Sequence, residues 1–180
     1  MQATTTLATT GERPAVVGLS WIDKLTIAAI VGIVVLVTVP HVERLARRDN
    51  ELDAMRTLRV LATQPVPPGA AQRAGTLQGL VGGDQMLARR LEDSTWLPDG
   101  SLQRHGYRFD LARGPLGEML LRAWPVEAGA TGRAAFLWNP RTGMLGHDNP
   151  ALAWSGELAP ALDQPLDERS GWRRMAQKQR

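Results

Sequence analysis

A long stretch without charged side chains, close to the N-terminus, constrains this chain more than any other feature. Residues 25–40 carry no charge and are mostly Ile, Val and Leu. As an α-helix, these sixteen residues span about 24 Å. Extended from Leu19 to Val42, the segment spans about 36 Å, enough to cross a hydrocarbon core of about 30 Å if Asp23 lies near one interface. The sequence therefore predicts one membrane-spanning helix over about residues 19–42, although a signal anchor or an uncleaved signal peptide also fits the hydropathy.

The composition excludes several kinds of functional centre. The chain has 180 residues, 43% of them apolar and 22% charged, which suits one compact domain with an appendage. It contains no Cys, which excludes disulfide scaffolds, thiol enzymes and Cys-ligated zinc or iron–sulfur sites. The three histidines, His41, His105 and His147, match no short metal-ligand spacing. We therefore expect neither a metal nor another cofactor.

The net charge of +3 comes from the end of the chain. Residues 170–180 contain no acidic side chain and four basic ones: Arg173, Arg174, Lys178 and Arg180. The remaining chain has 17 basic and 18 acidic side chains, a net charge of −1. We predict a solvated basic tail over residues 170–180, with contact to nucleic acid or anionic lipid as the alternative.

A short motif precedes the apolar segment. Residues 18–23 read Gly-Leu-Ser-Trp-Ile-Asp, which is a glycine, an apolar residue, a small polar residue, two apolar residues and an acid. Counted from Leu19, Gly32 follows 13 residues later and Pro40 follows 21 residues later. This register resembles the N-terminus of type IV pilins and type II secretion pseudopilins, over residues 18 to about 62.

The resemblance implies that a prepilin peptidase cleaves after Gly18, removes residues 1–18 as a leader, and leaves a Leu19 amine that is then methylated. It also implies that the Asp23 carboxylate pairs with the Leu19 amine of a neighbouring subunit. An unpaired carboxylate at the membrane end of an apolar helix costs a few kcal/mol, so Asp23 needs a cation. Lys24 follows directly but points to another helix face. Alternatively, the Asp23 side chain simply extends to the membrane interface.

The segment between Gly32 and Pro40 is a weak helix. Pro40 lacks a backbone N–H and its ring clashes with the carbonyl of Leu36, four residues earlier. We predict that this segment kinks or melts locally when subunits pack together. A helix that merely kinks where it leaves the bilayer is the alternative.

The residues after Pro40 continue the helical pattern. No helix breaker occurs before residue 62, and three prolines shortly after it, at 65, 67 and 68, end the helix. We predict a helical segment over residues 19–64, half in lipid and half amphipathic. Its amphipathic half has one apolar stripe at helical spacing that would pack against a small domain: Leu45, Leu52, Met55, Leu58 and Ala62.

Residues 65–169 are predicted to form a periplasmic head. Residues 70–83 are Gly-rich and indicate a loop. Asp84 is placed to cap a short helix that ends at Leu91, with Met86, Leu87 and Leu91 facing the core.

Alternating apolar residues then predict an antiparallel meander of three to four strands, and turn-rich segments separate the candidates. Its apolar face, which includes Tyr107 and Phe109, would cover the helix stripe. The expected fold class is α+β, and its layout resembles a pilin-like head. The four candidate strands are Tyr107–Leu111, Met119–Val126, Ala134–Asn139 and Met144–His147.

Other residues in the head are of types found in catalytic or metal sites, but they do not form the sequence motifs of such sites. His147, Asp148 and Ser155 are residue types of a hydrolase, but the surrounding Trp-Ser-Gly is not a nucleophile elbow. Asp148 and Asn149 could contribute to a calcium loop, although few oxygen ligands cluster there. Five tryptophans could stack on a ligand but are expected to serve packing, with the two in strands, at 124 and 138, half-buried: Trp96, Trp124, Trp138, Trp154 and Trp172.

These observations predict a non-enzymatic pilin or pseudopilin that assembles through its N-terminal helix into a type IV pilus-like or type II secretion filament. The expected partners are other subunits, a prepilin peptidase, an inner-membrane assembly platform and membrane lipid. The chain would cross the bacterial inner membrane once, with its head in the periplasm. That orientation rests on the motif, because Arg44, Arg47 and Arg48 fall on the non-cytoplasmic side. The alternatives are a surface-exposed minor pilin that binds DNA or acts as an adhesin, and a monomeric membrane-anchored periplasmic domain.

Overall fold

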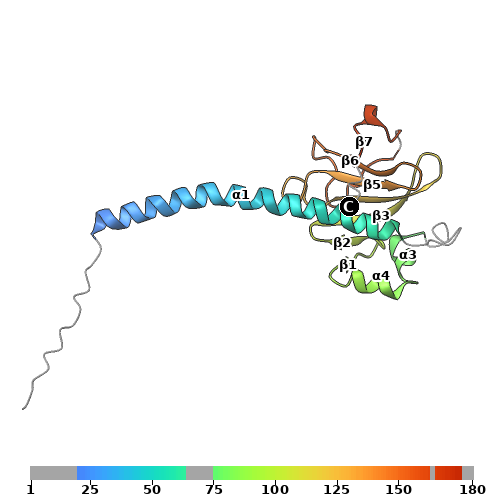
Figure 1. The fold of residues 1–180 in the computed structure, drawn as a ribbon, viewed down its shortest axis with the longest axis horizontal. Coiled ribbons are helices and arrows are strands. Elements are labelled where there is room, and N and C mark those ends of the chain that lie inside the picture. The colour runs from blue at the N-terminus through green and yellow to red at the C-terminus, as the bar shows by residue number, and fades with distance from the viewer. Residues whose placement is uncertain (1–19, 64–74, 163–164, 176–180) are drawn as a thin grey trace, which may run out of the picture. The chain divides into compact units, whose positions relative to one another are not determined.

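The computed structural model describes residues 20–63, 75–162 and 165–175 (Figure 1). The chain divides into two compact units, Met1–Pro40 and His41–Arg180. The elements in chain order are α1 (Trp21–Ala62), α3 (Leu77–Val81), α4 (Gln85–Arg90), β1 (Thr95–Trp96), β2 (Leu102–Arg104), β3 (Tyr107–Arg113), β4 (Met119–Pro125), β5 (Ala135–Asn139), β6 (Gly143–His147), the 3₁₀-helix η1 (Glu168–Ser170) and β7 (Arg173–Arg174).

The long N-terminal helix is confirmed. Helix α1 contains 42 residues and ends at Ala62, as the prolines that follow it predict. Its last turn closes through Thr63, whose backbone N–H donates to the carbonyl of Arg59 at 2.9 Å and whose hydroxyl donates to the carbonyl of Val60 at 3.0 Å. These bonds use carbonyl groups that the end of a helix would otherwise leave free.

The sheet of the second unit is antiparallel throughout and has seven strands, in the order β1 to β7, so that each strand pairs with the next in sequence. The four strands that the alternation predicts are confirmed as β3 to β6. The predicted number of three to four strands is wrong, because β1, β2 and β7 extend the sheet at both sides. These additional strands have only two or three residues, too few to produce a recognisable alternation.

Two short helices lie between α1 and the sheet in sequence. In α4, the Asp84 carboxylate accepts hydrogen bonds from the backbone N–H groups of Met86 and Leu87, at 2.9 and 3.1 Å, which confirms the predicted cap. The prediction that Met86 faces the core is wrong, since its side chain is 68% exposed. Residues 70–74 of the predicted loop lie outside the described residues. For the rest of it the prediction is wrong in part, because Leu77–Val81 forms α3, with Thr76 as its N-cap.

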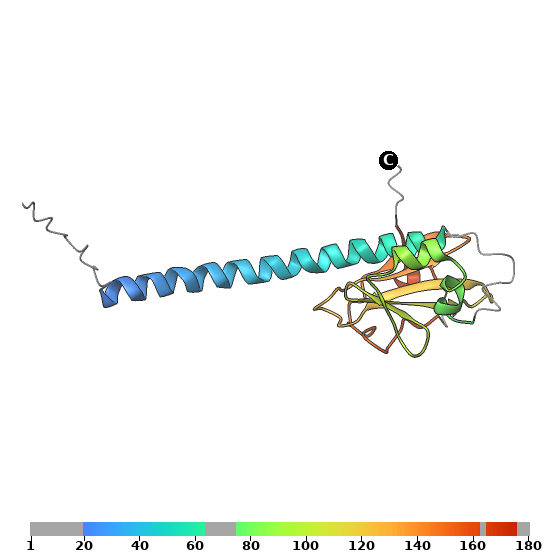
Figure 2. The ribbon, with the colours of Figure 1, turned by 90° about the horizontal axis from the view of Figure 1, so that it is seen from below.

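One face of the sheet packs against the C-terminal end of α1, residues 54–62, which lies over the sheet in Figures 1 and 2. Leu58 and Leu61 are completely or almost completely buried there, against Tyr107 and Phe109 of β3. The buried face of α1 consists of Ala54, Thr57, Leu58 and Leu61.

The predicted apolar stripe on α1 is therefore partly wrong. Leu58 is buried and Met55 and Ala62 pack at the edge of the core, but Leu45 and Leu52 are 48% and 38% exposed. The buried face is rotated about the helix axis relative to the predicted stripe, and it includes the small residues Ala54 and Thr57 beside Leu58 and Leu61.

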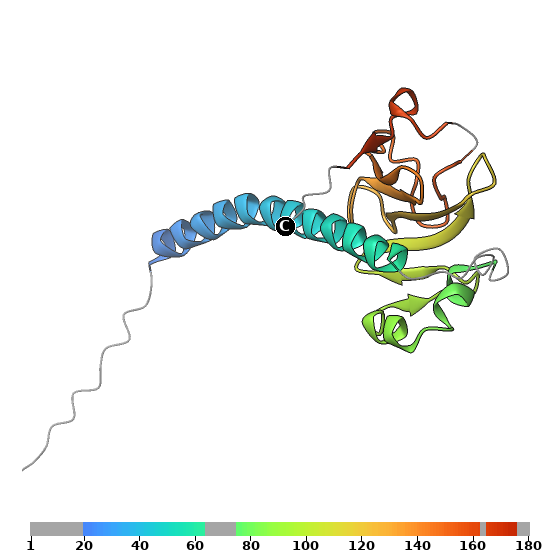
Figure 3. The same cartoon turned by 45° about the vertical axis from the view of Figure 1, so that its right-hand side comes forward.

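The opposite face of the sheet carries a second core, which the C-terminal part of the chain covers. Leu120, Trp124, Ala135, Leu137 and Leu145 alternate with the residues of the first core along β4, β5 and β6. Trp154 and Trp172 pack against them from outside the four central strands. In Figure 3, the green α3 and α4 lie at the β1 side of the sheet, and the orange-to-red C-terminal chain lies at the β6 and β7 side.

The end of the described chain belongs to this second core. Trp172 is only 4% exposed, and β7 pairs with β6 through Gly146↔Arg173 and Leu145↔Arg174. The prediction of a solvated tail from residue 170 is therefore wrong for residues 170–175, because a buried indole fixes this segment to the sheet. Residues 176–180 lie outside the described residues.

Gly132 provides a test of this packing. A Cβ atom at Gly132 would lie 2.6 Å from Cε2 and 2.7 Å from Cζ of the buried Tyr107, whose hydroxyl donates to the carbonyl of Ala134 at 2.9 Å. We expect Gly132→Ala to destabilise the head by about 1–3 kcal/mol, measured by urea unfolding of the full chain in detergent. Gly83→Ala is the control, since no atom lies within 4 Å of its Cβ position. Equal unfolding midpoints for the two variants would contradict the packing described.

Candidate functional site

The N-terminal end of α1 is closed by reciprocal hydrogen bonds. The Asp23 carboxylate accepts from the backbone N–H of Ser20 at 3.1 Å, and the Ser20 hydroxyl accepts from the backbone N–H of Ile22 at 3.4 Å. This arrangement is similar to a capping box. It places the Asp23 carboxylate beside the residue that follows Leu19 in the chain. Gly18 and Leu19, the predicted cleavage residues, lie outside the described residues.

The first part of α1 exposes apolar side chains. By length and composition α1 is able to cross a membrane, and none of its most apolar 18-residue window is buried in the chain itself. A helix that is apolar on all sides needs lipid or other apolar helices around it. The large exposed apolar residues over this part are Trp21, Ile22, Leu25, Ile27, Ile30, Val31, Ile33, Val34, Val35, Leu36, Val37, Val39 and Val42.

Gly32 and Pro40 both lie inside α1, and the helix is continuous through them. No atom lies within 4 Å of a Cβ built on Gly32, so this position leaves a shallow gap in the helix surface. Pro40 removes one backbone donor from the helix. Local melting between the two residues concerns the assembled state and stays a prediction.

Polar side chains at the start of the amphipathic half of α1 hold the loop between β4 and β5. Arg47 donates to the carbonyl of Gly129 at 2.8 Å, and Asn50 donates to the carbonyl of Thr131 at 2.8 Å. One Glu51 carboxylate oxygen accepts from the backbone N–H groups of residues 133 and 134, at 2.9 and 3.2 Å. Four backbone groups of one loop thus bond to three side chains within five residues of the helix, which fixes this part of the helix on the head.

A charged cluster makes the second attachment of α1. Asp53 lies 2.9 Å from Nδ1 of His105 and 3.6 Å from Nε of Arg104, both in the β2–β3 hairpin. Arg104 also donates to the Thr57 hydroxyl at 3.2 Å and pairs with Asp93 at 3.0 Å. These side chains bind one another through ion pairs and hydrogen bonds, so the cluster orients the helix on the sheet.

On the other face of the sheet, Trp124 lies between two guanidinium groups. The Cζ atoms of Arg108 and Arg122 are 5.8 and 5.6 Å from the Trp124 ring, within the range of cation–π attraction. The Trp124 indole N–H donates to the carbonyl of Gly156 at 2.8 Å, and Arg122 donates to the carbonyl of Pro160 at 2.7 Å. These bonds fasten the C-terminal chain onto the sheet.

The prediction for the two strand tryptophans is thus half right. Trp138 is half-buried as expected, but Trp124 is only 2% exposed. Sequence reasoning also missed the roles of Arg108 and Arg122. Arg108 lies directly opposite Trp124 across β3 and β4, and Arg122 lies opposite Asp110, with which it forms an ion pair. Only the strand register reveals these neighbours.

The structure does not bring the candidate hydrolase residues together. The Ser155 hydroxyl accepts from the backbone N–H of Ala128 at 3.0 Å and donates to the carbonyl of Val126 at 3.3 Å. Nδ1 of His147 accepts from the backbone N–H of Asn149 at 2.8 Å. The ring of His147 packs 4.5 Å from the ring of Trp154 between centroids. The Ser155 hydroxyl and the His147 ring thus stabilise the local fold and form no catalytic pair with each other.

The candidate calcium ligands Asp148 and Asn149 also form local contacts within the chain. The Asn149 side chain donates to the carbonyl of Trp154 at 3.1 Å and accepts from its N–H at 3.4 Å, while the exposed Asp148 lies 3.8 Å from Arg173. Within residues 20–63, 75–162 and 165–175, no three His, Asp or Glu side chains are grouped so that they could hold a metal ion. Asn149 thus shapes the loop before Trp154.

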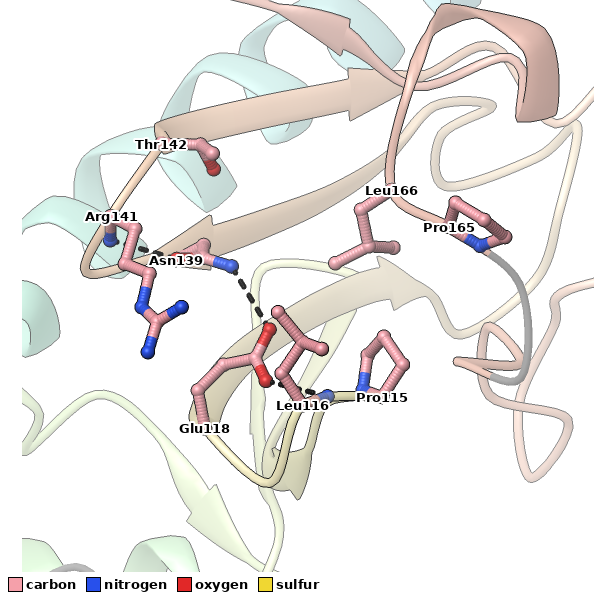
Figure 4. A pocket seen from close by; sticks show the side chains of 8 residues that line it. All are labelled: Pro115, Leu116, Glu118, Asn139, Arg141, Thr142, Pro165 and Leu166. Atoms are coloured by element: carbon pink, nitrogen blue, oxygen red, sulfur yellow. Dashed lines mark hydrogen bonds between the residues drawn. The ribbon is translucent and has the colours of Figure 1, made fainter.

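A shallow cavity of about 420 Å³ lies beside the β3–β4 and β5–β6 turns (Figure 4). Pro115, Leu116 and Leu166 form an apolar wall. The Glu118 carboxylate accepts from the backbone N–H of Leu116 at 3.0 Å and from the Asn139 amide at 3.4 Å, so both its oxygens are already bonded. The cavity offers apolar contact, without an acid or base free to act on a bound molecule among its described lining residues.

Comparison with protein-family models, with curated proteins and with solved structures finds no match to this chain. The functional conclusion therefore depends on the chain's own residues and geometry.

His147 provides a pH test of the C-terminal packing. Burial is the main cause that lowers the pKa of His147 below 6.5, and Arg173 acts in the same direction, while the Ser170 backbone and Asp148 oppose them. Both folded and unfolded chains hold a neutral His147 well above pH 6.5. Below it the unfolded chain binds the proton first, so the free energy of unfolding falls until folded His147 also titrates.

We expect the urea midpoint of the full chain in detergent to fall between about pH 7.5 and pH 5.5 by more than that of His147→Gln. The difference between the two chains isolates His147 from other titrating groups. An identical pH dependence in both chains would show that burial of His147 does not couple protonation to folding.

Proposed function

We propose that this chain is a non-enzymatic, pilin-like subunit of a type II secretion or type IV pilus-like filament. One observation carries the proposal: a single helix exposes apolar side chains on all sides over residues 21–42 and is fixed to an α+β head over residues 47–61. Membrane insertion requires the exposed apolar side chains. Presentation of a folded domain at a fixed position on a filament requires the attachment of the helix to the head.

The apolar half of α1 serves two environments in succession. Before assembly it lies in the bacterial inner membrane, with the head in the periplasm. During assembly the same surface packs against the helices of neighbouring subunits, under the action of an inner-membrane assembly platform. Lipid tails and apolar side chains solvate this surface about equally well, so transfer between them needs no change in the helix surface. Gly32 and Pro40 would make the segment between them the part that adapts to neighbours.

Asp23 sets the register between subunits in this proposal. A prepilin peptidase cleaves after Gly18, and the Leu19 amine of one subunit then pairs with the Asp23 carboxylate of the next. Support comes from the position of Asp23, whose carboxylate already lies at the start of α1 and accepts from the backbone of Ser20. An acid left unpaired among apolar helices is costly, so packing in any other register is disfavoured.

Asp23→Ala tests this function. We expect the variant to stay in the membrane, because the apolar segment is unchanged, and to lose cross-linked multimers by about tenfold or more, the equivalent of about 1.4 kcal/mol per contact. The measurement is chemical cross-linking in membranes of cells that carry the assembly machinery, after alkaline carbonate extraction to confirm insertion.

Asp23→Glu is the matched control, since it keeps the carboxylate and should retain multimers. Wild-type amounts of multimers in Asp23→Ala would reject the register mechanism. Absence of multimers in the unchanged chain as well would instead identify a monomeric membrane-anchored domain.

A further inference from the structure

Three arginines follow the apolar part of α1 within one and a half helical turns. Arg47 is committed to the head, because it donates to the carbonyl of Gly129 at 2.8 Å and lies 3.8 Å from the Glu43 carboxylate. Arg44 and Arg48 are exposed, and neither forms an ion pair with an acid in the part of the chain that the structure describes. Their charges therefore face outward.

The positions around Arg44 and Arg48 give these charges no partner on the helix. The two arginines are four residues apart and share one face of the helix, so their like charges repel each other. No acid stands three or four residues before or after Arg44. Glu51 follows Arg48 by three residues, but it accepts from two backbone N–H groups of the loop just before β5. An external anion between the two guanidinium groups would relieve this repulsion.

The distance along the helix indicates which anion. Arg44 stands two residues beyond Val42, the last residue of the apolar segment, and Arg48 stands six residues beyond it. At 1.5 Å per residue these are about 3 and 9 Å. The headgroup layer on one side of a bilayer is about 5–7 Å thick. Arg44 thus falls inside this layer, and the flexible side chain of Arg48 can extend back into it.

We propose that Arg44 and Arg48 together bind the phosphate of an anionic phospholipid at the surface of the membrane that α1 crosses. The inference rests on the proposed function, which places α1 in that membrane. A planar guanidinium donates two parallel hydrogen bonds to phosphate oxygens, and two such groups one turn apart can hold one phosphate from both sides. The site gives the subunit a fixed depth before assembly. It also gives Arg44 and Arg48 a role on the non-cytoplasmic side, although basic residues flanking membrane helices are usually more frequent on the cytoplasmic side.

The test measures lipid bound to the full chain in detergent micelles by native mass spectrometry. Phosphatidylglycerol is the anionic probe and phosphatidylcholine the zwitterionic one. We expect the double variant Arg44→Gln, Arg48→Gln to retain about tenfold less phosphatidylglycerol than the unchanged chain. The matched control is Arg56→Gln, Arg59→Gln, which removes the same charge from exposed arginines about 18 Å further along α1 and should leave retention unchanged.

Equal retention in the unchanged chain and the Arg44, Arg48 variant would overturn the site. Equal losses in both double variants would also overturn it, since they would reflect net charge alone. Unchanged lipid retention together with lost cross-linking would assign the two arginines to carboxylates of a second copy. Failure of the proposed function is recognised separately, because the unchanged chain would then form no cross-linked multimers or would be released by alkaline carbonate, whereas failure of the lipid site changes neither result.

Discussion

The burial of one face of α1 against the sheet is the contact on which the head depends. Leu58 and Leu61 share one buried core with Tyr107 and Phe109 of β3, and α3 and α4 add Leu77, Val81 and Leu87 to the same core. Apolar contact alone would allow the helix to slide or rotate. The hydrogen bonds of Glu51 and the Asp53 cluster prevent this, because each leaves backbone or charged groups unpaired if the helix shifts by one residue.

The C-terminal part of the chain covers the second face of the sheet without a disulfide bond. The chain has no Cys, and its C-terminal part is instead fastened by hydrogen bonds from Arg122 and Trp124 and by a stack of Trp154 on Trp172, 5.6 Å apart. Each of these interactions contributes modestly, of the order of 1 kcal/mol. Together they hold β7 on the sheet, which turns residues expected in a tail into part of the fold. The head is therefore covered on both faces of its sheet, by helix on one and by the C-terminal chain on the other.

Elements with a local sequence signal could be predicted from the sequence, and contacts with distant partners could not. The end of α1, the Asp84 cap and strands β3 to β6 follow from local signals, namely prolines, an N-cap residue and alternation over at least five residues. Strands β1 and β2 pair with near neighbours but are too short to show an alternation, whereas β7 and the burial of Trp124 depend on partners far away in sequence. Apolar spacing predicts Leu45 and Leu52 on the inward face of α1, but the buried face also uses Ala54 and Thr57, which apolar spacing does not single out. Asp23 was recognised as the candidate assembly residue, but its bond to Ser20 needed coordinates.

The proposed assembly requires that the chain is processed so that a free amine lies at the membrane end of α1, where Asp23 of another copy can pair with it. N-terminal sequencing of the protein, extracted from membranes of cells that make a prepilin peptidase, tests this claim most directly. Processing after Gly18 gives a chain that begins at Leu19, with Asp23 as its fifth residue. A membrane-embedded chain that still begins at Met1 would contradict the claim.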